Sequence, residues 1–254
     1  MKVTFLGTGT SHGIPVIGCH CPVCESKDVK DKRYRSSIAL EKNGKRLVID
    51  TGYEFRLQML RAKFDTLDGV LYTHSHADHL SGIDDLRVFA YNNNFPIYGN
   101  ASTINFIKSH YSYAFQGPQF PGIPHFEAHT LQPYKSVDIS GFKVLPVAVE
   151  HGRMTKMEIL GYRIDDNFAY VTDVSNMPET TYDALNGVET LVIGALRKKP
   201  HGAHFSFSDA YNAAKRIGAK NIYFTHINHE TSYSEINSLY SDAKSAYDML
   251  ELEV

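Results

Sequence analysis

The chain contains no tryptophan, and only three of its 254 residues are cysteines. These are Cys19, Cys21 and Cys24, which lie within six consecutive positions. An odd, tightly clustered set of cysteines does not supply the paired framework of a disulfide-rich secreted domain. In a reducing compartment, thiols spaced this closely favour a metal-binding knuckle.

Neither sign of charge is in large excess, because 26 Lys and Arg accompany 28 Asp and Glu and leave a formal net charge of −2. A strongly basic nucleic-acid-binding protein is therefore not expected. No apolar run approaches the roughly 18–20 residues of a membrane span. Residues 1–7 lack the apolar core of a signal peptide. Together these absences predict a soluble, cytoplasmic protein with no membrane partner, for which nucleic acid is not the expected ligand.

The sequence does have the means to build a large core. Hydrophobic residues make up 43% of it, and a protein of this size removes roughly 70–75% of its unfolded-state surface from water. No linker rich in Gly, Ser or Pro divides the chain. We expect one hydrolase domain over residues 1–254, with the cysteine knuckle inserted at about residues 18–30.

Short apolar runs alternate with helical patterns along the chain, which predicts an α/β (α+β) architecture. The clearest helix is residues 206–217, where Ser206 and Asp209 form a capping pattern and Gly218 marks the end. Other helices are expected at residues 53–62, 101–108 and 234–243. Strands are expected at residues 3–6, 37–40, 46–50, 70–73, 142–149, 168–172, 190–196 and 221–225. Residues 111–127, rich in Gly, Pro and aromatic residues, indicate a long loop typical of a lid or a contact surface.

Four metal-capable side chains follow the predicted strand 70–73 within six residues. They are His74, His76, Asp78 and His79. Neutral imidazole and carboxylate suit zinc, manganese or iron. Ligands this close together in a turn can divide between two ions, and a pair of divalent ions can activate water and stabilise displacement at phosphorus.

This His-x-His-x-Asp-His motif resembles the metal signature of the metallo-β-lactamase superfamily. The resemblance continues in order with three single residues that each follow a predicted strand, namely His151, Asp173 and His226. It implies a four-layer αββα sandwich with two metal ions at the edge of the paired sheets. It also implies a division of the ligands. His74, His76 and His151 hold one ion, Asp78, His79 and His226 hold the other, and Asp173 bridges them.

The cysteine knuckle needs a fourth ligand to close a structural zinc site, and His229 lies three residues after His226. The Cys-x-Cys-x-x-Cys pattern resembles an insertion in the phosphodiesterases of phosphonate degradation and in a related protein of quinone-cofactor biosynthesis. Residues 6–15 and 82–87 also resemble that branch. In the phosphodiesterases the fourth ligand is a His shortly after the last active-site His, which implies His229 here.

His204 stands just before the capped helix, and it resembles an additional active-site histidine of the phosphodiesterase branch. Imidazole titrates close to neutral pH, so His204 is the candidate that protonates the departing oxygen. His201 is the competing candidate. With Asp78, which is also a predicted metal ligand, His204 makes up the predicted catalytic set.

The resemblance implies a metal-dependent phosphodiesterase that cleaves a small cyclic phosphodiester, such as phosphoribosyl 1,2-cyclic phosphate, by attack of a hydroxide bridging two Mn or Zn ions. One structural Zn would occupy the knuckle, and a homodimer is plausible. Two alternatives remain open. One is a transfer-RNA 3′-processing endoribonuclease, although no basic Gly/Pro arm is visible between His79 and Asp173. The other is a non-hydrolytic metal-binding accessory protein of cofactor biosynthesis.

Overall fold

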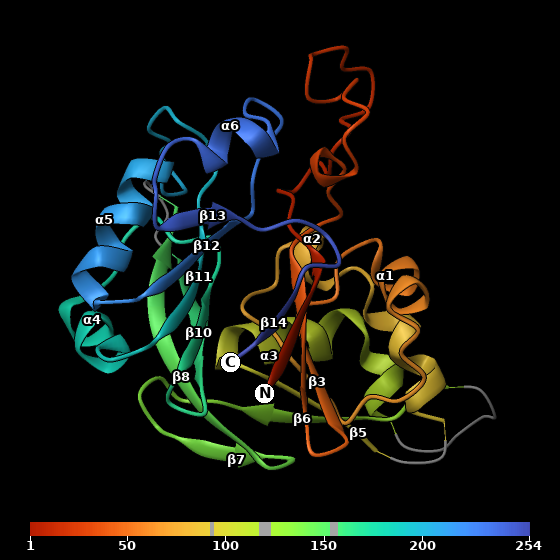
Figure 1. The fold of residues 1–254 in the computed structure, drawn as a ribbon. Helices are drawn as coiled ribbons and strands as arrows, with labels where there is room; N and C mark the ends of the chain where they lie inside the picture. Colours follow the sequence, from red (N-terminus) through yellow and green to blue (C-terminus); the bar gives the residue numbers. More distant parts are fainter. Residues whose placement is uncertain (92–93, 117–122, 153–156) are drawn as a thin grey trace.

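A computed structural model describes residues 1–91, 94–116, 123–152 and 157–254. Within them the strands form two seven-stranded sheets that face each other (Figure 1). The first sheet, in spatial order, contains β14 (Glu251–Glu253), β1 (Lys2–Gly7), β2 (Ser37–Lys42), β3 (Lys45–Ile49), β4 (Gly69–Leu71), β5 (Phe95–Gly99) and β6 (Phe126–Thr130). The second contains β13 (Ala243–Ser245), β12 (Asn221–Thr225), β11 (Thr190–Gly194), β10 (Phe168–Val171), β9 (Met157–Ile164), β8 (Phe142–His151) and β7 (Val137–Ile139).

Helices cover the outer face of each sheet (Figure 1). The helices on the side of the first sheet are α1 (Phe55–Ala62), α2 (Ala77–Leu80) and α3 (Ala101–His110). On the side of the second sheet they are α4 (Glu179–Leu185), α5 (Phe207–Ile217) and α6 (Tyr233–Asn237). Three short 3₁₀ helices complete the list: η1 (Val29–Asp31), η2 (Ile83–Phe89) and η3 (Ser112–Phe115). The predicted four-layer αββα sandwich is confirmed.

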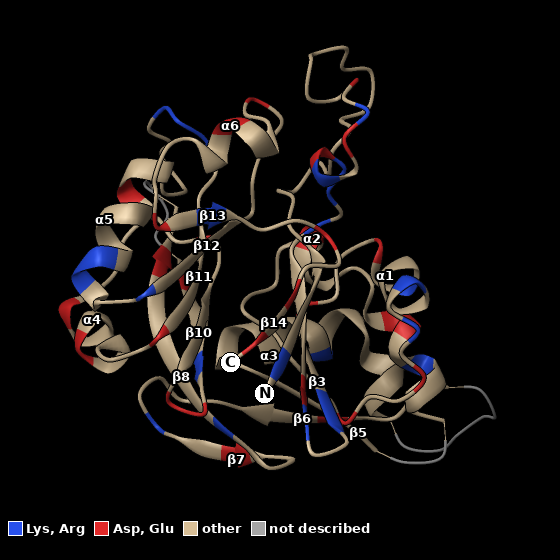
Figure 2. Ribbon diagram, in the orientation of Figure 1, with Lys and Arg blue, Asp and Glu red and all other residues tan. Residues whose placement is uncertain are grey.

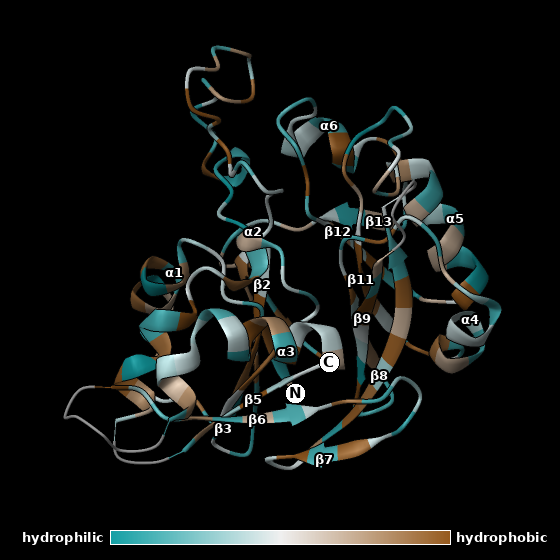
Figure 3. Cartoon of the chain, turned by 180° about the vertical axis from the view of Figure 1, so that it is seen from behind, coloured by the Kyte–Doolittle hydropathy of each residue, from teal (hydrophilic) through white to brown (hydrophobic). Residues whose placement is uncertain are grey.

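Three hydrophobic clusters lie between these four layers and hold them together. The middle cluster joins the two sheets, where Phe5 and Leu71 of the first sheet share a buried environment with Tyr162 and Tyr170 of the second. The outer clusters pack helices against each sheet. Figure 3, which views the chain from behind, shows brown hydrophobic segments along the strands between the two helical layers. Because each sheet is buried on both faces, its central strands are apolar throughout rather than alternating.

Strand direction explains why polar residues far apart in sequence meet. Strands β3 and β4 are parallel, and so are β10, β11 and β12. Strand β8 runs the same way as β10, because both are antiparallel to β9. The carboxyl ends of these strands therefore lie at one edge of the sandwich, where a chain leaving a strand places exposed or ligand-binding side chains.

The observed ends of the helices show where local sequence signals are enough to predict a helix boundary. Ser206 and Asp209 form the predicted capping box of α5, and Gly218 ends the helix with φ +82°. The prediction of one helix over residues 234–243 is wrong, because α6 ends at Asn237 and the chain then enters β13. The apolar side chains there satisfy packing against the sheet, which overrides helical periodicity.

The expected loop at residues 111–127 is only partly a loop. It begins with η3 and ends in β6, whose strand pairing with β5 was not apparent from the sequence. Residues 117–122 lie outside the described residues. Among the described residues, no helix is long and apolar enough to cross a membrane.

Candidate metal centre

The predicted active-site ligands converge at the shared edge of the two sheets. His74 follows β4, His76 caps α2, and His151 is the last residue of β8. Their ring centroids lie 4.6 Å (His74–His76), 5.0 Å (His76–His151) and 5.4 Å (His74–His151) apart. These three side chains form one group that can hold a metal ion.

A second group of potential ligands adjoins the first. It contains Asp78, His79, Asp173 and His226. The Nε2 atom of His79 lies 3.1 Å from an oxygen of Asp173, and that of His226 lies 3.2 Å from the other Asp173 oxygen. Asp173 also belongs to a group with His151, which touches the first set. The Asp173 carboxylate is thus placed between the two sets, as its predicted bridging role requires.

Three buried nitrogen atoms show that this edge is suited to cations. The Nε2 atoms of His74, His79 and His226 are buried, and none of them has a well-aligned hydrogen bond to a described residue, although Asp173 oxygens lie near two of them. An unpaired buried polar atom is costly unless a ligand satisfies it. Imidazole nitrogens grouped with two carboxylates are a donor set for divalent first-row metals. The residues present therefore fit a metal centre.

The other ring nitrogens are held by the protein. His79 Nδ1 lies 2.7 Å from Asp50 Oδ2, and His151 Nδ1 lies 3.0 Å from the carbonyl oxygen of Ala203. Such partners fix the tautomer and the orientation of a metal-binding histidine, so that Nε2 points to the ion. Asp50 is not among the functional residues predicted from the sequence, although it ends the predicted strand 46–50.

Asp50 is itself held firmly. Its carboxylate accepts hydrogen bonds from the backbone amide and the hydroxyl of Thr73, each at 2.8 Å. Burial raises the pKa of Asp50, and the neighbouring His79 counteracts this effect. Burial alone would lower the pKa of His79, but the carboxylates of Asp173, Asp78 and Asp50 outweigh it and hold that pKa well above its usual value. The cluster thus attracts positive charge strongly.

His204 lies beside the centre, and its ring stacks between those of His226 and His201. Its Nδ1 is 3.5 Å from Asp173 Oδ1 and its ring stacks on that of His226 at a centroid distance of 4.8 Å. On its other side, the ring of His201 stacks at 5.3 Å. Burial lowers the pKa of His204 to about 3 despite the Asp173 carboxylate. The structure thus places His204 nearer to the centre than its competitor His201, which is exposed.

The cysteine knuckle also assembles with the histidine predicted for it. It lies in the segment between β1 and β2 that projects from the body of the molecule (Figure 1). The Sγ atoms of Cys19, Cys21 and Cys24 lie 3.3, 3.4 and 3.5 Å from Nδ1 of His229. Burial opposes ionisation of Cys21, but hydrogen bonds from the Cys24 amide and His229 lower its pKa to about 6. These four residues form a group that can hold a metal ion.

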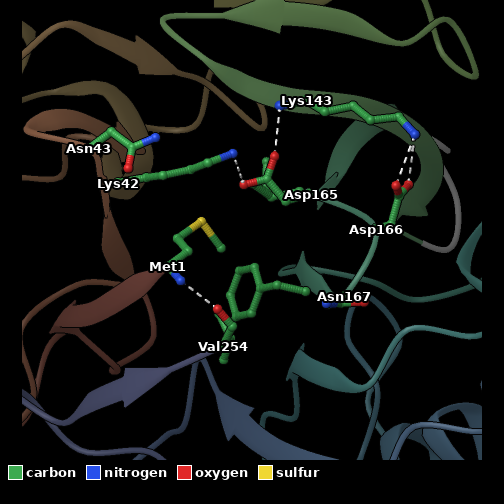
Figure 4. A pocket seen from close by; sticks show the side chains of 10 residues that line it. Met1, Lys42, Asn43, Lys143, Asp165, Asp166, Asn167 and Val254 are labelled. Carbon is green, nitrogen blue, oxygen red and sulfur yellow. Dashed lines mark hydrogen bonds and ion pairs between the residues drawn. The ribbon is translucent and has the colours of Figure 1, made fainter.

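A separate pocket of about 460 Å³ near the chain ends contains lysines but does not offer them to a ligand (Figure 4). Lys42 bonds to Asp165 at 2.7 Å, and Lys143 bonds to Asp166 at 2.9 Å. Elsewhere, Lys and Arg are interspersed with Asp and Glu rather than gathered on one element (Figure 2). In that view, the described part of the chain shows no face of Lys and Arg alone, which is the pattern expected of a surface that grips a nucleic acid.

An αββα sandwich with His/Asp groups at one edge defines the class of metal-dependent hydrolases. The family model described as "Beta-lactamase superfamily domain" matches residues 45–227. A solved structure of a diphosphatase of the PhnP family is 37% identical, with a TM-score of 0.91, and the match covers 100% of this chain and 96% of that one. The chain therefore belongs to the metallo-β-lactamase superfamily, in its PhnP-like branch.

Two further relatives set limits on what the likeness says about activity. Zn²⁺-bound PqqB from Methylobacterium extorquens has a TM-score of 0.84 and covers 100% of both chains, but at 18% identity it shows the fold alone. A protein of Porphyromonas gingivalis named octanoyltransferase is 34% identical over 99% of this chain. The chain covers only 51% of that relative's length, so the relative's name describes a longer protein.

Proposed function

We propose that this chain is a phosphodiesterase that cleaves a small phosphodiester, for which phosphoribosyl 1,2-cyclic phosphate is the model substrate. The observation that carries the proposal is the convergence of His74, His76 and His151 with a second ligand set around Asp173. The likeness to a PhnP-family diphosphatase supports a substrate with a phosphoryl centre. The even charge balance favours a small substrate over RNA.

The proposed ligand division follows the two groups. One divalent ion, Mn or Zn, would be held by His74, His76 and His151, and the other by Asp78, His79 and His226, with Asp173 between them. Bound there, such ions supply an activated water and stabilise negative charge at phosphorus. The sandwich edge orients these side chains before any substrate arrives, through the partners of His79 and His151.

His204 is the proposed proton donor to the departing oxygen. Burial keeps its ring neutral at neutral pH in the free protein, since its pKa is lowered to about 3. A bound phosphodiester brings negative charge next to the ring, which raises the affinity of the ring for a proton. The role of His204 is therefore confined to the substrate complex, where general acid catalysis typically contributes about 10²–10⁴-fold.

The test is hydrolysis of phosphoribosyl 1,2-cyclic phosphate, beside 2′,3′-cyclic nucleotides, by the manganese-loaded protein. We expect His204→Ala to lower kcat by about 10²-fold or more while the bound metal, counted by mass spectrometry, stays unchanged. His201→Ala is the matched control on the same loop and should keep most of the activity. Equal loss of metal and turnover in His204→Ala would contradict the assignment of the proton donor.

The same assays separate the alternatives. Salt-dependent binding and cleavage of structured RNA would favour the transfer-RNA endoribonuclease. The name of the P. gingivalis relative suggests an octanoyl thioester as a further substrate. Its hydrolysis would favour attack at a carbonyl carbon over attack at phosphorus. Absence of turnover with fully loaded metals would favour the accessory-protein alternative.

We further propose that the knuckle holds one structural Zn through Cys19, Cys21, Cys24 and His229, and that residues 1–254 act as one domain. A cytoplasmic location and a homodimer remain predictions. Size-exclusion chromatography with light scattering measures the oligomeric state directly.

A further inference from the structure

A buried threonine directly precedes three of the predicted metal ligands. The three pairs are Thr73–His74, Thr172–Asp173 and Thr225–His226. Each pair stands where a strand ends at the edge that carries the metal centre. A buried hydroxyl costs free energy unless it is bonded, so the partners of each threonine show what it does for the ligand beside it.

The Thr73 hydroxyl bridges a metal ligand and a supporting carboxylate. It lies 2.8 Å from Asp50 Oδ2 and 3.0 Å from His74 Nδ1. A hydroxyl has one hydrogen to donate, and the Asp50 carboxylate accepts it, so the same hydroxyl accepts from His74. The His74 ring therefore carries its hydrogen on Nδ1, which leaves the lone pair of Nε2 for a metal ion.

The same oxygen of Asp50 supports a second metal ligand. Asp50 Oδ2 also lies 2.7 Å from His79 Nδ1, which donates to it. One carboxylate oxygen thus sets the tautomer of His79 directly and that of His74 through Thr73. The two histidines belong to different groups of potential ligands. The chain of hydrogen bonds His74–Thr73–Asp50–His79 consequently joins the two groups from behind.

Burial makes this chain of hydrogen bonds effective. All four of its residues are almost completely shielded from water. Hydrogen bonds are stronger in such surroundings than in water, and linked ones polarise one another. The Thr73 backbone amide also donates to Asp50 Oδ1 at 2.8 Å, which holds the carboxylate in the orientation that the chain needs.

The other two threonines form no such bridge among the described residues. The Thr172 hydroxyl donates to Oδ2 of its own neighbour Asp173 at 2.8 Å. The Thr225 hydroxyl makes no hydrogen bond to a described residue. A threonine before a ligand is therefore not by itself a link, and the contacts of Thr73 distinguish it from the other two.

We propose that Thr73 is a positioning residue that couples the two metal sites, because its hydroxyl transmits the orientation of Asp50 to His74. The inference rests on the proposed function only for the division of the ligands between two ions, and it requires no substrate. Once His79 is fixed at its Nε2 atom, Asp50, Thr73 and His74 have less freedom to lose. Filling either site should therefore strengthen the other, since a coupling free energy is reciprocal.

The experiment titrates the full chain with Mn²⁺ and measures the free ion by electron paramagnetic resonance. Thiolates prefer zinc, so a zinc-loaded knuckle stays outside the count. We expect the wild type to bind two Mn²⁺ cooperatively. Thr73→Val removes the hydroxyl and should weaken the binding of one ion by about 10- to 100-fold, the usual cost of losing a partner of a metal-bound histidine. It should also abolish the cooperativity.

Two further variants separate the hydroxyl from a general effect on packing. Thr73→Ser keeps the hydroxyl and should retain both affinities. Thr225→Val is the matched control, because it removes a buried hydroxyl next to His226 that bonds to no described residue. It should leave both dissociation constants unchanged. Circular dichroism checks the fold of each variant.

A double-mutant cycle with Asp50→Asn tests the link itself. Asp50→Asn should weaken both ions in the wild type, but only one of them in the Thr73→Val background. Wild-type affinities in Thr73→Val, equal losses in Thr73→Ser and Thr73→Val, or the same effect of Asp50→Asn in both backgrounds would each overturn this inference alone. A wild type that binds no Mn²⁺ would overturn the two-ion centre of the proposed function and the inference with it.

Discussion

The two clusters that can hold metal differ in what holds their ligands. The active-site ligands come from the ends of several strands, and His74, His79, Asp173 and His226 are almost completely buried. The knuckle takes its three thiols from one projecting loop, in which Cys19 and Cys21 are only half-buried. One cluster is thus part of the sheet edge, whereas the other is attached to the body chiefly through His229.

This difference teaches which cluster depends on an ion for its shape. At the active site, protein groups such as Asp50 and the Ala203 carbonyl fix the rings from behind. In the knuckle, the thiols contact mainly one another, neighbouring amides and His229. A site without such support forms when the metal binds, so the binding free energy of the ion is also folding free energy.

The largest effect is expected when an active-site ligand loses the protein group that orients it, because this tests whether the active-site cluster really differs from the knuckle. Asp50→Asn should lower kcat by about 10- to 100-fold, the usual cost of losing a partner of a metal-bound histidine, because His79 Nδ1 loses its carboxylate. Turnover and bound metal are measured together, with circular dichroism to check the fold. Asp68→Asn, a carboxylate at the opposite end of the first sheet, is the control. Full activity in Asp50→Asn would show that the sheet edge alone orients His79.

A smaller effect on turnover is expected from breaking the knuckle. Cys21→Ser should lose one zinc per chain. In this variant, or in the wild type after a chelator has removed the metal, trypsin should cleave the segment between β1 and β2 while the core resists cleavage. We expect kcat to fall less than tenfold, because the knuckle and the active-site ligands form separate groups, and His229 is three residues away from His226 along the chain. Limited proteolysis and metal counting check this, with Ser26→Ala as control. A loss as large as that of Asp50→Asn would make the two clusters one functional unit.

The third prediction concerns stability, with the smallest effect expected on turnover, and tests how the base of the knuckle is anchored. Asp248 accepts hydrogen bonds from the Thr8 hydroxyl and the Tyr34 amide, each at 2.7 Å. Burial raises its pKa from 3.8 to about 7. Because the unfolded chain loses this proton first, the free energy of unfolding should fall as pH rises from about 4 through 7, by at most about 1.4 kcal/mol per pH unit.

Asp248→Asn should flatten this dependence, and urea unfolding at pH 5 and pH 8 measures it. Asp242→Asn changes a half-exposed carboxylate that pairs with Lys215, and it serves as the control. A wild-type protein that is equally stable at both pH values, with the variant unchanged, would show that Asp248 is not protonated in the folded state.

Much of this arrangement was predictable because it depends on local order in the sequence. The resemblance to the metal signature of the superfamily, read together with the position of each residue after an apolar strand, located His151, Asp173 and His226, and parallel strand ends meet at one edge. The capping box of α5 is equally local. Asp50 was missed because nothing in a single sequence distinguishes a carboxylate that supports a ligand from one that ends a strand.

Contacts between distant segments were not predictable. Strand β9 follows residues 153–156, which the structure leaves undescribed, and its register against β8 depends on packing of the whole sheet. The hydrogen bond from Asn176 to Glu150 joins residues 26 positions apart, and no motif marks it. Tertiary packing decides such pairs, whereas sequence patterns report mainly the face and the end of each element.

The peptide of Ala203 is bonded on both sides, since its amide donates to His201 and its carbonyl accepts from His151. A ligand that shifts this loop must therefore turn the His151 ring as well. Were His151 to hold cobalt, a displacement of this loop would change the visible spectrum of that metal. The backbone of one alanine would thus couple the position of the loop to an optical signal.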